Sequence, residues 1–175
     1  VAVAPDGTTL IVKDIADSNY YLTDLDNPES TTPLGRFVSF NDFSNKGTEI
    51  LFVSLDFLNR DQFPFILKIN QERMEERLTD GSESSIDPAF LEDGSILYAV
   101  RETQVQGTKG IFKIIEQNLA GEVVREIDDE TRSFELPIVS PDSSFVLLEA
   151  YDTTAITDLL NSRLVNLQPR PNKGT

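Results

Sequence analysis

The sequence has no cysteine, no histidine and no tryptophan among its 175 residues. Without cysteine there is no disulfide, no zinc–thiolate site and no thiol nucleophile, and the redox state of the compartment is left open. Without histidine there is no Ser-His-Asp triad, no imidazole base and no ordinary transition-metal site. Without tryptophan the commonest platform for stacking a sugar is missing. These absences leave few routes to catalysis.

Basic residues are scarce too: 15 Lys and Arg stand against 30 Asp and Glu, for a formal net charge of −15. Because phosphate binding needs clustered Lys and Arg, this charge argues against nucleic acid and anionic membrane surfaces as partners. No apolar run approaches the roughly 18 residues of a transmembrane helix. The balance of 39% hydrophobic and 26% charged residues is that of a globular protein, and the length suits one or two domains.

The first residues, Val1–Gly7, include no methionine and lack the charged and apolar regions of a signal peptide. We therefore expect either a processed product or a piece of a longer protein, and favour the piece.

One pattern recurs four times: an apolar pair, a turn centred on Asp-Gly or a substitute, and a short apolar run. The turn's last residue falls at positions 7, 47, 94 and 143, at spacings of 40, 47 and 49 residues. Asp and Gly accept the positive φ of a tight reversal, so each unit is predicted to be a β-hairpin. Ser143 stands where the other turns have glycine, which predicts a weaker fourth turn. The four segments are Val3–Val12, Phe43–Val53, Phe90–Val100 and Val139–Leu148.

Further strands follow each hairpin. A third strand is predicted in every unit, at Tyr20–Leu25, Phe65–Ile69, Gly110–Ile115 and Arg163–Leu167, and a fourth at Met74–Thr79 and Glu122–Ile127. The corresponding stretch of the first unit, Glu29–Leu34, is a weak candidate. That of the last unit, Gln168–Thr175, contains two prolines, which argue against a paired strand.

Three to four antiparallel strands in every 40–49 residues match the period of a β-propeller blade. The predicted fold is therefore all-β and propeller-like, with about four blades in a ring that could be incomplete. The approximate units are 1–36, 37–84, 85–133 and 134–167, followed by a tail at 168–175.

The same residues resemble the blades of TolB-type propellers, which are related to the WD-repeat class. Those blades typically read leucine-threonine-(aspartate)-glycine, a short gap, proline-alanine-phenylalanine-serine-proline-aspartate-glycine, and then an apolar strand. The first half is matched by Leu78–Gly81 and Asp87–Phe90, and the second half by Ala4–Gly7 and Ser140–Asp142. The similarity spans residues 1 to about 167. It implies a non-enzymatic propeller of the bacterial cell envelope, periplasmic or extracellular, that binds other proteins.

The chain departs from this family in having four units where six blades are usual. Three arrangements are therefore open: a four-bladed ring without a strand clasp, which we favour, an open arc from a larger propeller, or two chains that complete one ring. Exposed sheet edges are disfavoured, which is the reason for the preference.

Each candidate for chemistry has a simpler structural interpretation. Carboxylate pairs could cleave glycosides, but Asp6, Asp93 and Asp142 lie in turns, where aspartate bonds its own backbone. Calcium could bind at Asp24–Asn27 or Asp128–Glu130, but neither has the spacing of an EF-hand loop, and a turn and a solvated loop are expected instead.

The candidate serine nucleophiles and the candidate phosphate loop also have simpler structural interpretations. Ser44 and Ser140 are expected to be turn hydroxyls, since the chain has no histidine and no Ser-x-x-Lys motif. Gly107–Gly110 precedes a strand and not a helix, so it is not a phosphate loop. Two loops are candidates for recognition: Phe57–Pro64, which is more simply expected to pack between blades, and Ala150–Asn161, where Thr157–Leu160 could form a helical turn.

We therefore predict no catalytic, cofactor-binding or metal-ligating residue and no cofactor. The predicted function is that of a protein-interaction module with a protein partner. The acidic net charge favours a partner with a basic face. Two alternatives stay open: a carboxylate-based, carbohydrate-active propeller enzyme, and the non-catalytic propeller of a larger peptidase. The enzyme predicts two or more acids of raised pKa facing each other in a central channel. The interaction module predicts no cluster of such acids, and an apolar patch on one rim.

Overall fold

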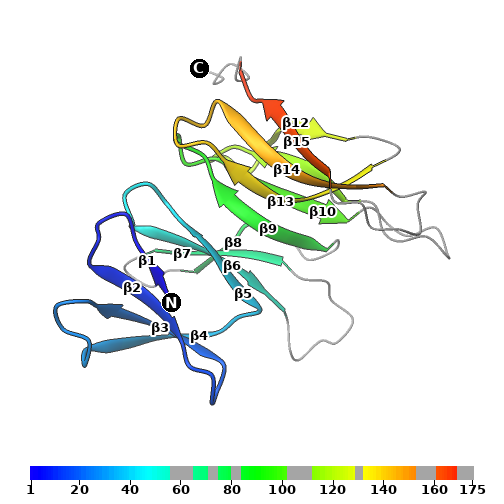
Figure 1. The fold of residues 1–175 in the computed structure, drawn as a ribbon. Helices are drawn as coiled ribbons and strands as arrows, with labels where there is room; N and C mark the ends of the chain where they lie inside the picture. The colour runs from blue at the N-terminus through cyan, green and yellow to red at the C-terminus, as the bar shows by residue number, and fades with distance from the viewer. Residues whose placement is uncertain are drawn as a thin grey trace.

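The computed structural model describes residues 1–55, 65–70, 75–79, 84–101, 112–128, 132–152 and 161–168. These residues form fifteen strands in four separate antiparallel sheets (Figure 1). The described part of the chain contains no helix, and hence none long and apolar enough to cross a membrane. The all-β prediction is confirmed.

In each sheet the strands follow one another in chain order. The first sheet holds β1 (Ala2–Val3), β2 (Thr9–Lys13), β3 (Asn19–Asp24) and β4 (Thr31–Arg36). The second holds β5 (Ser39–Phe43), β6 (Glu49–Ser54), β7 (Phe65–Asn70) and β8 (Glu75–Arg77). The third holds β9 (Ser85–Phe90), β10 (Ile96–Arg101), β11 (Phe112–Gln117) and β12 (Val123–Ile127). The fourth holds β13 (Arg132–Val139), β14 (Phe145–Asp152) and β15 (Asn161–Asn166). The boundaries of the four predicted units stay predictions.

The recurring turns join the first two strands of every sheet, and they share one geometry. The last residue of each turn donates its N–H to the carbonyl oxygen three residues back, over 2.7–2.9 Å. That residue has a positive φ in all four: 78° at Gly7, 68° at Gly47, 86° at Gly94 and 51° at Ser143. Ser143 is strained in this region, where glycine is favoured. Its turn nevertheless keeps the hydrogen bond that the other three make.

The fourth strand of the first sheet is better formed than its sequence suggests. β4 pairs with β3 despite Pro33, with a register shift between Tyr20 and Tyr21. Because β4 is the edge strand, its proline need not donate to a further neighbour. The fourth sheet has three strands in the described residues. Residues 169–175, where two prolines argue against a fourth strand, lie outside them.

Neighbouring sheets are held together by three apolar cores. An aromatic cluster joins the first two sheets: Phe37 stacks on Phe52 with their ring centroids 4.3 Å apart, and Tyr20 meets Phe52 edge-on at 5.3 Å. Tyr20 also accepts a 3.2 Å hydrogen bond from the backbone N–H of Phe40. The second core contains Leu51, Ile66, Phe90, Tyr98 and Ile115, and the third contains Leu97, Ile114, Val146, Leu148 and Leu167.

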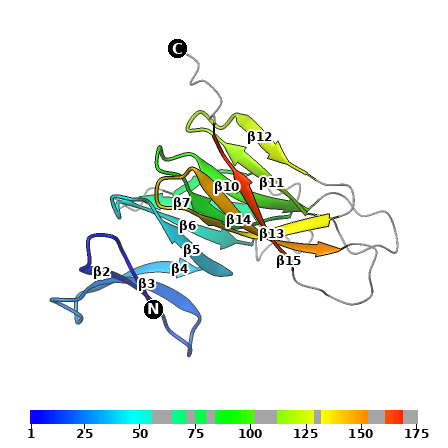
Figure 2. The same cartoon turned by 45° about the horizontal axis from the view of Figure 1, so that its top comes forward.

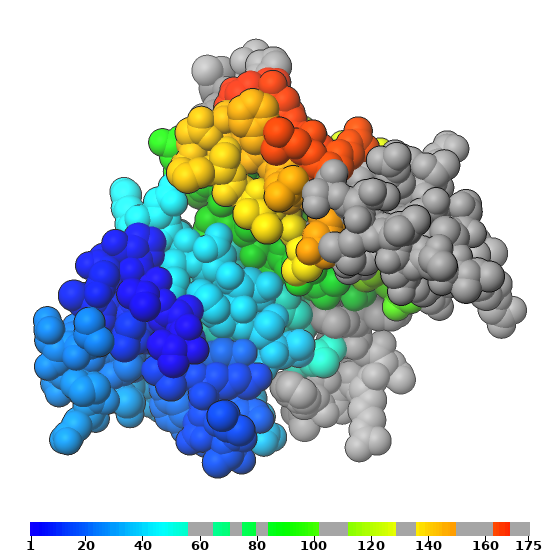
Figure 3. Space-filling view, in the orientation of Figure 1, coloured from blue at the N-terminus to red at the C-terminus, as the bar shows by residue number. Residues whose placement is uncertain are grey.

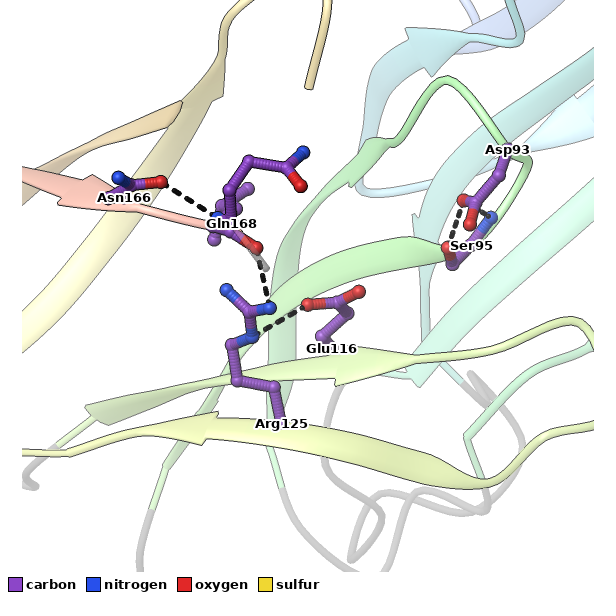
Figure 4. Close-up of polar contacts among 7 residues, drawn as sticks. Asp93, Ser95, Glu116, Arg125, Asn166 and Gln168 are labelled. Carbon is purple, nitrogen blue, oxygen red and sulfur yellow. Dashed lines mark hydrogen bonds and ion pairs between the residues drawn. The ribbon is translucent and has the colours of Figure 1, made fainter. Parts of the chain in front are cut away.

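Arg125, which forms an ion pair with a buried carboxylate of its own sheet, makes a polar link between the last two sheets (Figure 4). Arg125 of β12 lies 3.1 Å from the carboxylate of Glu116 on β11, which is almost fully buried. The same guanidinium donates a 2.7 Å hydrogen bond to the carbonyl oxygen of Leu167, just after β15. One side chain therefore connects the outer region of the third sheet to the end of the fourth.

The four sheets form an open arc, with the first and fourth sheets at its two ends (Figures 1 and 2). This corrects the preferred expectation of a closed four-bladed ring. The physical reason is that each internal interface has its own core, whereas no core of described residues joins the first sheet to the fourth. The predicted helical turn at Thr157–Leu160 and the loop at Phe57–Pro64 lie outside the described residues.

Candidate functional site

The innermost strands of the four sheets border a groove of about 580 Å³. Figure 3 shows the molecule with the first sheet in blue and the fourth in yellow to red. Acidic, amide and apolar side chains all line this groove. Its described lining includes Val3, Asn41, Asp42, Asn45, Asp87, Leu136, Ile138 and Glu149.

The same backbone irregularity shapes β9 and β13 on the groove wall. Asp87–Pro88 face a single residue of β10, and Leu136–Pro137 face a single residue of β14, because the register shifts at both places. Asp87 and Leu136 have φ values of 51° and 49°. Each stands seven residues before the last residue of its turn. These two β-bulges therefore repeat from one sheet to the next and turn their side chains toward the groove.

Asp42 of β5 is a half-buried carboxylate that binds two backbone N–H groups. One oxygen accepts a 2.8 Å hydrogen bond from its neighbour Phe43, and the other accepts a 2.8 Å bond from Phe90 of β9. Burial raises the pKa of Asp42 above its ordinary value, and the two hydrogen bonds partly oppose this shift. The carboxylate thus ties the inner strand of the second sheet to that of the third.

Asp87 of β9 makes the equivalent link between the third and fourth sheets. Burial raises the pKa of Asp87, a hydrogen bond from the backbone of Leu136 lowers it, and the charge of Glu149 raises it again. Leu136 belongs to β13, so this carboxylate ties the third sheet to the fourth. Asp42 and Asp87 are therefore interface carboxylates whose oxygens already accept backbone hydrogen bonds.

The groove contains features that bear on both functional alternatives. The enzyme alternative predicted two or more acids of raised pKa facing each other in a central channel; Asp42 and Asp87 have raised pKa values and both line the groove. The interaction module predicted no cluster of such acids; Asp42 and Asp87 each accept hydrogen bonds from backbone N–H groups of a different sheet, and this expectation stays a prediction. It also predicted an apolar rim, and Val3, Leu136 and Ile138 are exposed along this groove. Both carboxylates accept hydrogen bonds from backbone amides. This feature distinguishes the interaction module from the enzyme, because an enzyme needs carboxylates that are free to react.

The aspartates predicted to be turn residues are found as such. Asp6 accepts hydrogen bonds from the backbone of Thr8 and Thr9 at 2.9 and 2.8 Å. Asp93 accepts one from Ser95 at 3.0 Å, and Asp142 one from Ser144 at 3.1 Å. The hydroxyl and amide of Ser144, with the hydroxyl of Ser140, lower the pKa of Asp142 to about 2.

The calcium and serine candidates also have structural roles where they are described. Asp24 accepts a 2.8 Å hydrogen bond from the backbone of Asp26 in the turn after β3. The hydroxyl of Ser44 accepts a 3.0 Å hydrogen bond from the backbone N–H of Glu49, and that of Ser140 accepts one of the same length from Phe145. The described residues hold no group of three or more acids that could bind a metal. Gly107–Gly110 and Asp129–Glu130 lie outside the described residues.

Sequence reasoning misses Asp42 and Asp87. The available signal is an acid in the innermost strand, shortly before the phenylalanine that leads into the turn: Asp42 directly precedes Phe43, and Asp87 stands three residues before Phe90. Their partners lie in the next sheet, so no local pattern names them.

The fold resembles solved propeller structures. A TolB from Agrobacterium tumefaciens matches with a TM-score of 0.72 and 20% identity, over 94% of this chain and 60% of that one. TolB from Acinetobacter baumannii matches with a TM-score of 0.60 and 18% identity, over 91% of this chain and 41% of that one. An oligogalacturonate lyase in complex with manganese matches with a TM-score of 0.52 and 15% identity, over 93% of this chain and 63% of that one.

The chain thus spans less than two thirds of the length of each of these structures. No family model matches the sequence, and no curated protein does. At these identities the likeness concerns the fold, and it agrees with the resemblance carried by the blade motifs.

Proposed function

We propose, from the premise that this chain has a TolB-like β-propeller fold, that it is a non-catalytic protein-interaction module. The observation that carries the proposal is the chemistry of the groove. Its half-buried acids, Asp42 and Asp87, accept hydrogen bonds from backbone N–H groups of the next sheet, while its apolar side chains are exposed. A site of this kind offers contact surface and not free catalytic groups.

The partner we propose is a protein segment that combines apolar and basic side chains. Val3, Leu136 and Ile138 provide exposed apolar contacts, and Glu149 with the net charge of −15 favours a cationic partner. The resemblance to TolB-type propellers adds a periplasmic or extracellular setting. The proposal includes a homodimer that completes the ring.

Binding of an extended peptide containing lysine and leucine, measured by calorimetry at low and high salt, tests this role. Asn45→Lys places a positive charge at the groove, so it is expected to weaken binding several-fold. Asn27→Lys is the matched control, because it adds the same charge in the exposed turn after β3, away from the groove lining. Equal affinities for the two variants, or no binding by the unaltered chain, would count against the proposal.

A second candidate, a carbohydrate-active enzyme using carboxylates alone, is favoured by the raised pKa values of Asp42 and Asp87 beside a groove. The lyase among the structural neighbours has the same fold class. Incubating the chain with oligogalacturonate and following unsaturated products by absorbance tests it. Product formation that is lost in Asp87→Asn would establish this function and displace the first.

A third candidate, the propeller of a larger peptidase, depends on sequence outside these 175 residues. Reading the full-length gene tests it, since a hydrolase domain in the same polypeptide would support it.

A further inference from the structure

A second hollow, which we call the inter-sheet cleft, lies between the second and third sheets. Its volume is about 340 Å³, within the usual range of sites for small ligands. One wall is the end of β8 and the residue after it, Arg77 and Leu78, and the other is the turn between β11 and β12, at Asn118–Gly121. The described lining of the cleft shares no residue with that of the groove, so the two are separate sites.

The carboxamide of Gln117, the last residue of β11, lies between the two walls of the inter-sheet cleft. Its Nε2 donates a long hydrogen bond of 3.4 Å to the carbonyl oxygen of Leu78, on one wall. A Cβ added to Gly121, on the other wall, would meet the same nitrogen at 3.4 Å. Gln117 is only 8% exposed, and its Oε1 is buried with no hydrogen-bond partner among the described residues. Because a buried oxygen that accepts no hydrogen bond costs stability, this side chain calls for a role outside folding.

The repeat shows that the turn after β11 does not need Gln117. The equivalent residues of the first and fourth sheets are Asp24 and Asn166, since each of the three pairs with the first residue of the second strand of its sheet. Asp24 and Asn166 each accept a 2.8 Å hydrogen bond from the backbone N–H two residues later. In the third sheet Asn118 takes over this task and accepts a 3.0 Å bond from the backbone N–H of Ala120. Gln117 is therefore available for the inter-sheet cleft.

The charged side chains that line the inter-sheet cleft already have partners. Nζ of Lys68 lies 3.3 Å from the carboxylate of Glu49 and 2.8 Å from that of Glu76. Nε of Arg77 donates a 2.8 Å hydrogen bond to the carbonyl oxygen of Thr79. An ionic ligand would have to compete with these contacts, so the cleft favours a neutral one.

We propose that the inter-sheet cleft binds the main chain of a short, neutral, extended peptide through the carboxamide of Gln117. An extended residue presents its N–H and C=O on the same side, so the N–H donates to Oε1 while the C=O accepts from Nε2. The terminal torsion of glutamine is soft, and turning the carboxamide toward the cleft gives up the long bond to Leu78. Leu119, which is 71% exposed on the cleft wall, offers an apolar contact to the peptide's side chain. This inference does not depend on the function of the groove.

The experiment is a titration of the isotope-labelled 175-residue chain with acetyl-leucine methylamide, followed by nuclear magnetic resonance. Saturable shifts are expected for the side-chain amide of Gln117 and the backbone amide of Gly121. The analogue methylated at the leucine nitrogen lacks the N–H that Oε1 would accept, and is expected to bind about ten-fold more weakly. Gln117→Leu should weaken binding to a similar extent without lowering the urea midpoint of unfolding, because it removes the buried oxygen that has no partner.

Two control variants separate the inter-sheet cleft from other sites. Gln168→Leu makes the same replacement at an exposed residue outside the described cleft lining, and Asn45→Lys alters the groove, so both should bind like the unaltered chain. Equal weakening by Gln117→Leu and Gln168→Leu, or weakening by Asn45→Lys, would place the peptide elsewhere. Undiminished binding of the methylated analogue would show that Oε1 accepts no hydrogen bond from the ligand. No saturable shift in the folded chain, or a lower urea midpoint for Gln117→Leu, would assign this side chain a purely structural role.

Discussion

The hydroxyl of Ser143 accepts a 2.7 Å hydrogen bond from the backbone N–H of Glu92, joining the turn of the fourth sheet to the turn of the third. Ser143 is 2% exposed and has a positive φ of 51°. Glycine at this position would avoid the backbone strain but could not accept the bond. In the second sheet the equivalent Gly47 instead lies directly against the first turn, where an added Cβ would meet Ala4 at 3.4 Å.

Replacing Ser143 separates these two effects. Ser143→Ala keeps the strained φ and leaves the Glu92 N–H without its acceptor, so it is expected to lower the free energy of unfolding by about 1–3 kcal/mol. Ser143→Gly loses the same bond but relieves the backbone, and is expected to be less destabilised by about 1 kcal/mol. Urea unfolding of both variants checks the order, and Ala at least as stable as Gly would contradict it.

The aromatic cluster should dominate the attachment of the first sheet. Phe52 is completely buried and contacts the rings of Tyr20, Phe37 and Phe40. Phe52→Ala is therefore expected to lower the free energy of unfolding by about 3–5 kcal/mol. Phe145→Ala, at a residue 40% exposed on β14, is the control and should cost much less. Thermal unfolding of the two variants measures the difference, and similar losses would contradict the role of the cluster.

The ion pair between Arg125 and Glu116 predicts that the stability lost on replacing Arg125 depends on whether Glu116 is present. Arg125→Met removes the cation that lies 3.1 Å from the buried carboxylate of Glu116, and also the hydrogen bond to Leu167, which is expected to cost about 3–5 kcal/mol. Adding Glu116→Leu removes the buried charge itself, so the double variant should be more stable than Arg125→Met alone. Denaturant unfolding of both checks this, and a double variant that is less stable would show that the two costs add.

The strands and their repeat could be predicted from local chemistry, because turn residues and short apolar runs act over a few positions. Pairings between sheets could not. Phe90 and Asp42 are 48 residues apart, and nothing in the inner strand states which amide its carboxylate meets. The sequence predicts a weaker turn at Ser143. It does not show the compensating hydrogen bond, because the partner of the Ser143 hydroxyl, Glu92, lies in another unit. The sequence leaves the choice between a closed ring and an open arc undecided for the same reason, since ring closure depends on the angle between sheets and not on any one strand.

The buried carboxylate of Asp42 predicts a pH dependence of stability with a sign opposite to that of Asp142. Because the pKa of Asp42 is raised in the folded protein, the native state binds more protons than the unfolded state between the ordinary value of 3.8 and the raised value. The free energy of unfolding contributed by this group therefore increases as the pH falls from neutral through that window. In Asp42→Asn the contribution is absent, so the stability of the unaltered chain relative to this variant should grow on acidification.

Asp142 provides the matched control for that measurement. Its pKa is lowered to about 2, so its contribution is present above 3.8 and is lost as the pH falls toward 2. The stability of the unaltered chain relative to Asp142→Asn should therefore shrink on acidification below that value. Urea unfolding of the three proteins at a series of pH values measures both differences. A gap between the unaltered chain and Asp42→Asn that stays constant or narrows toward acid would show that the carboxylate is not held in a desolvated interface, because only burial raises its pKa against the two hydrogen bonds that lower it.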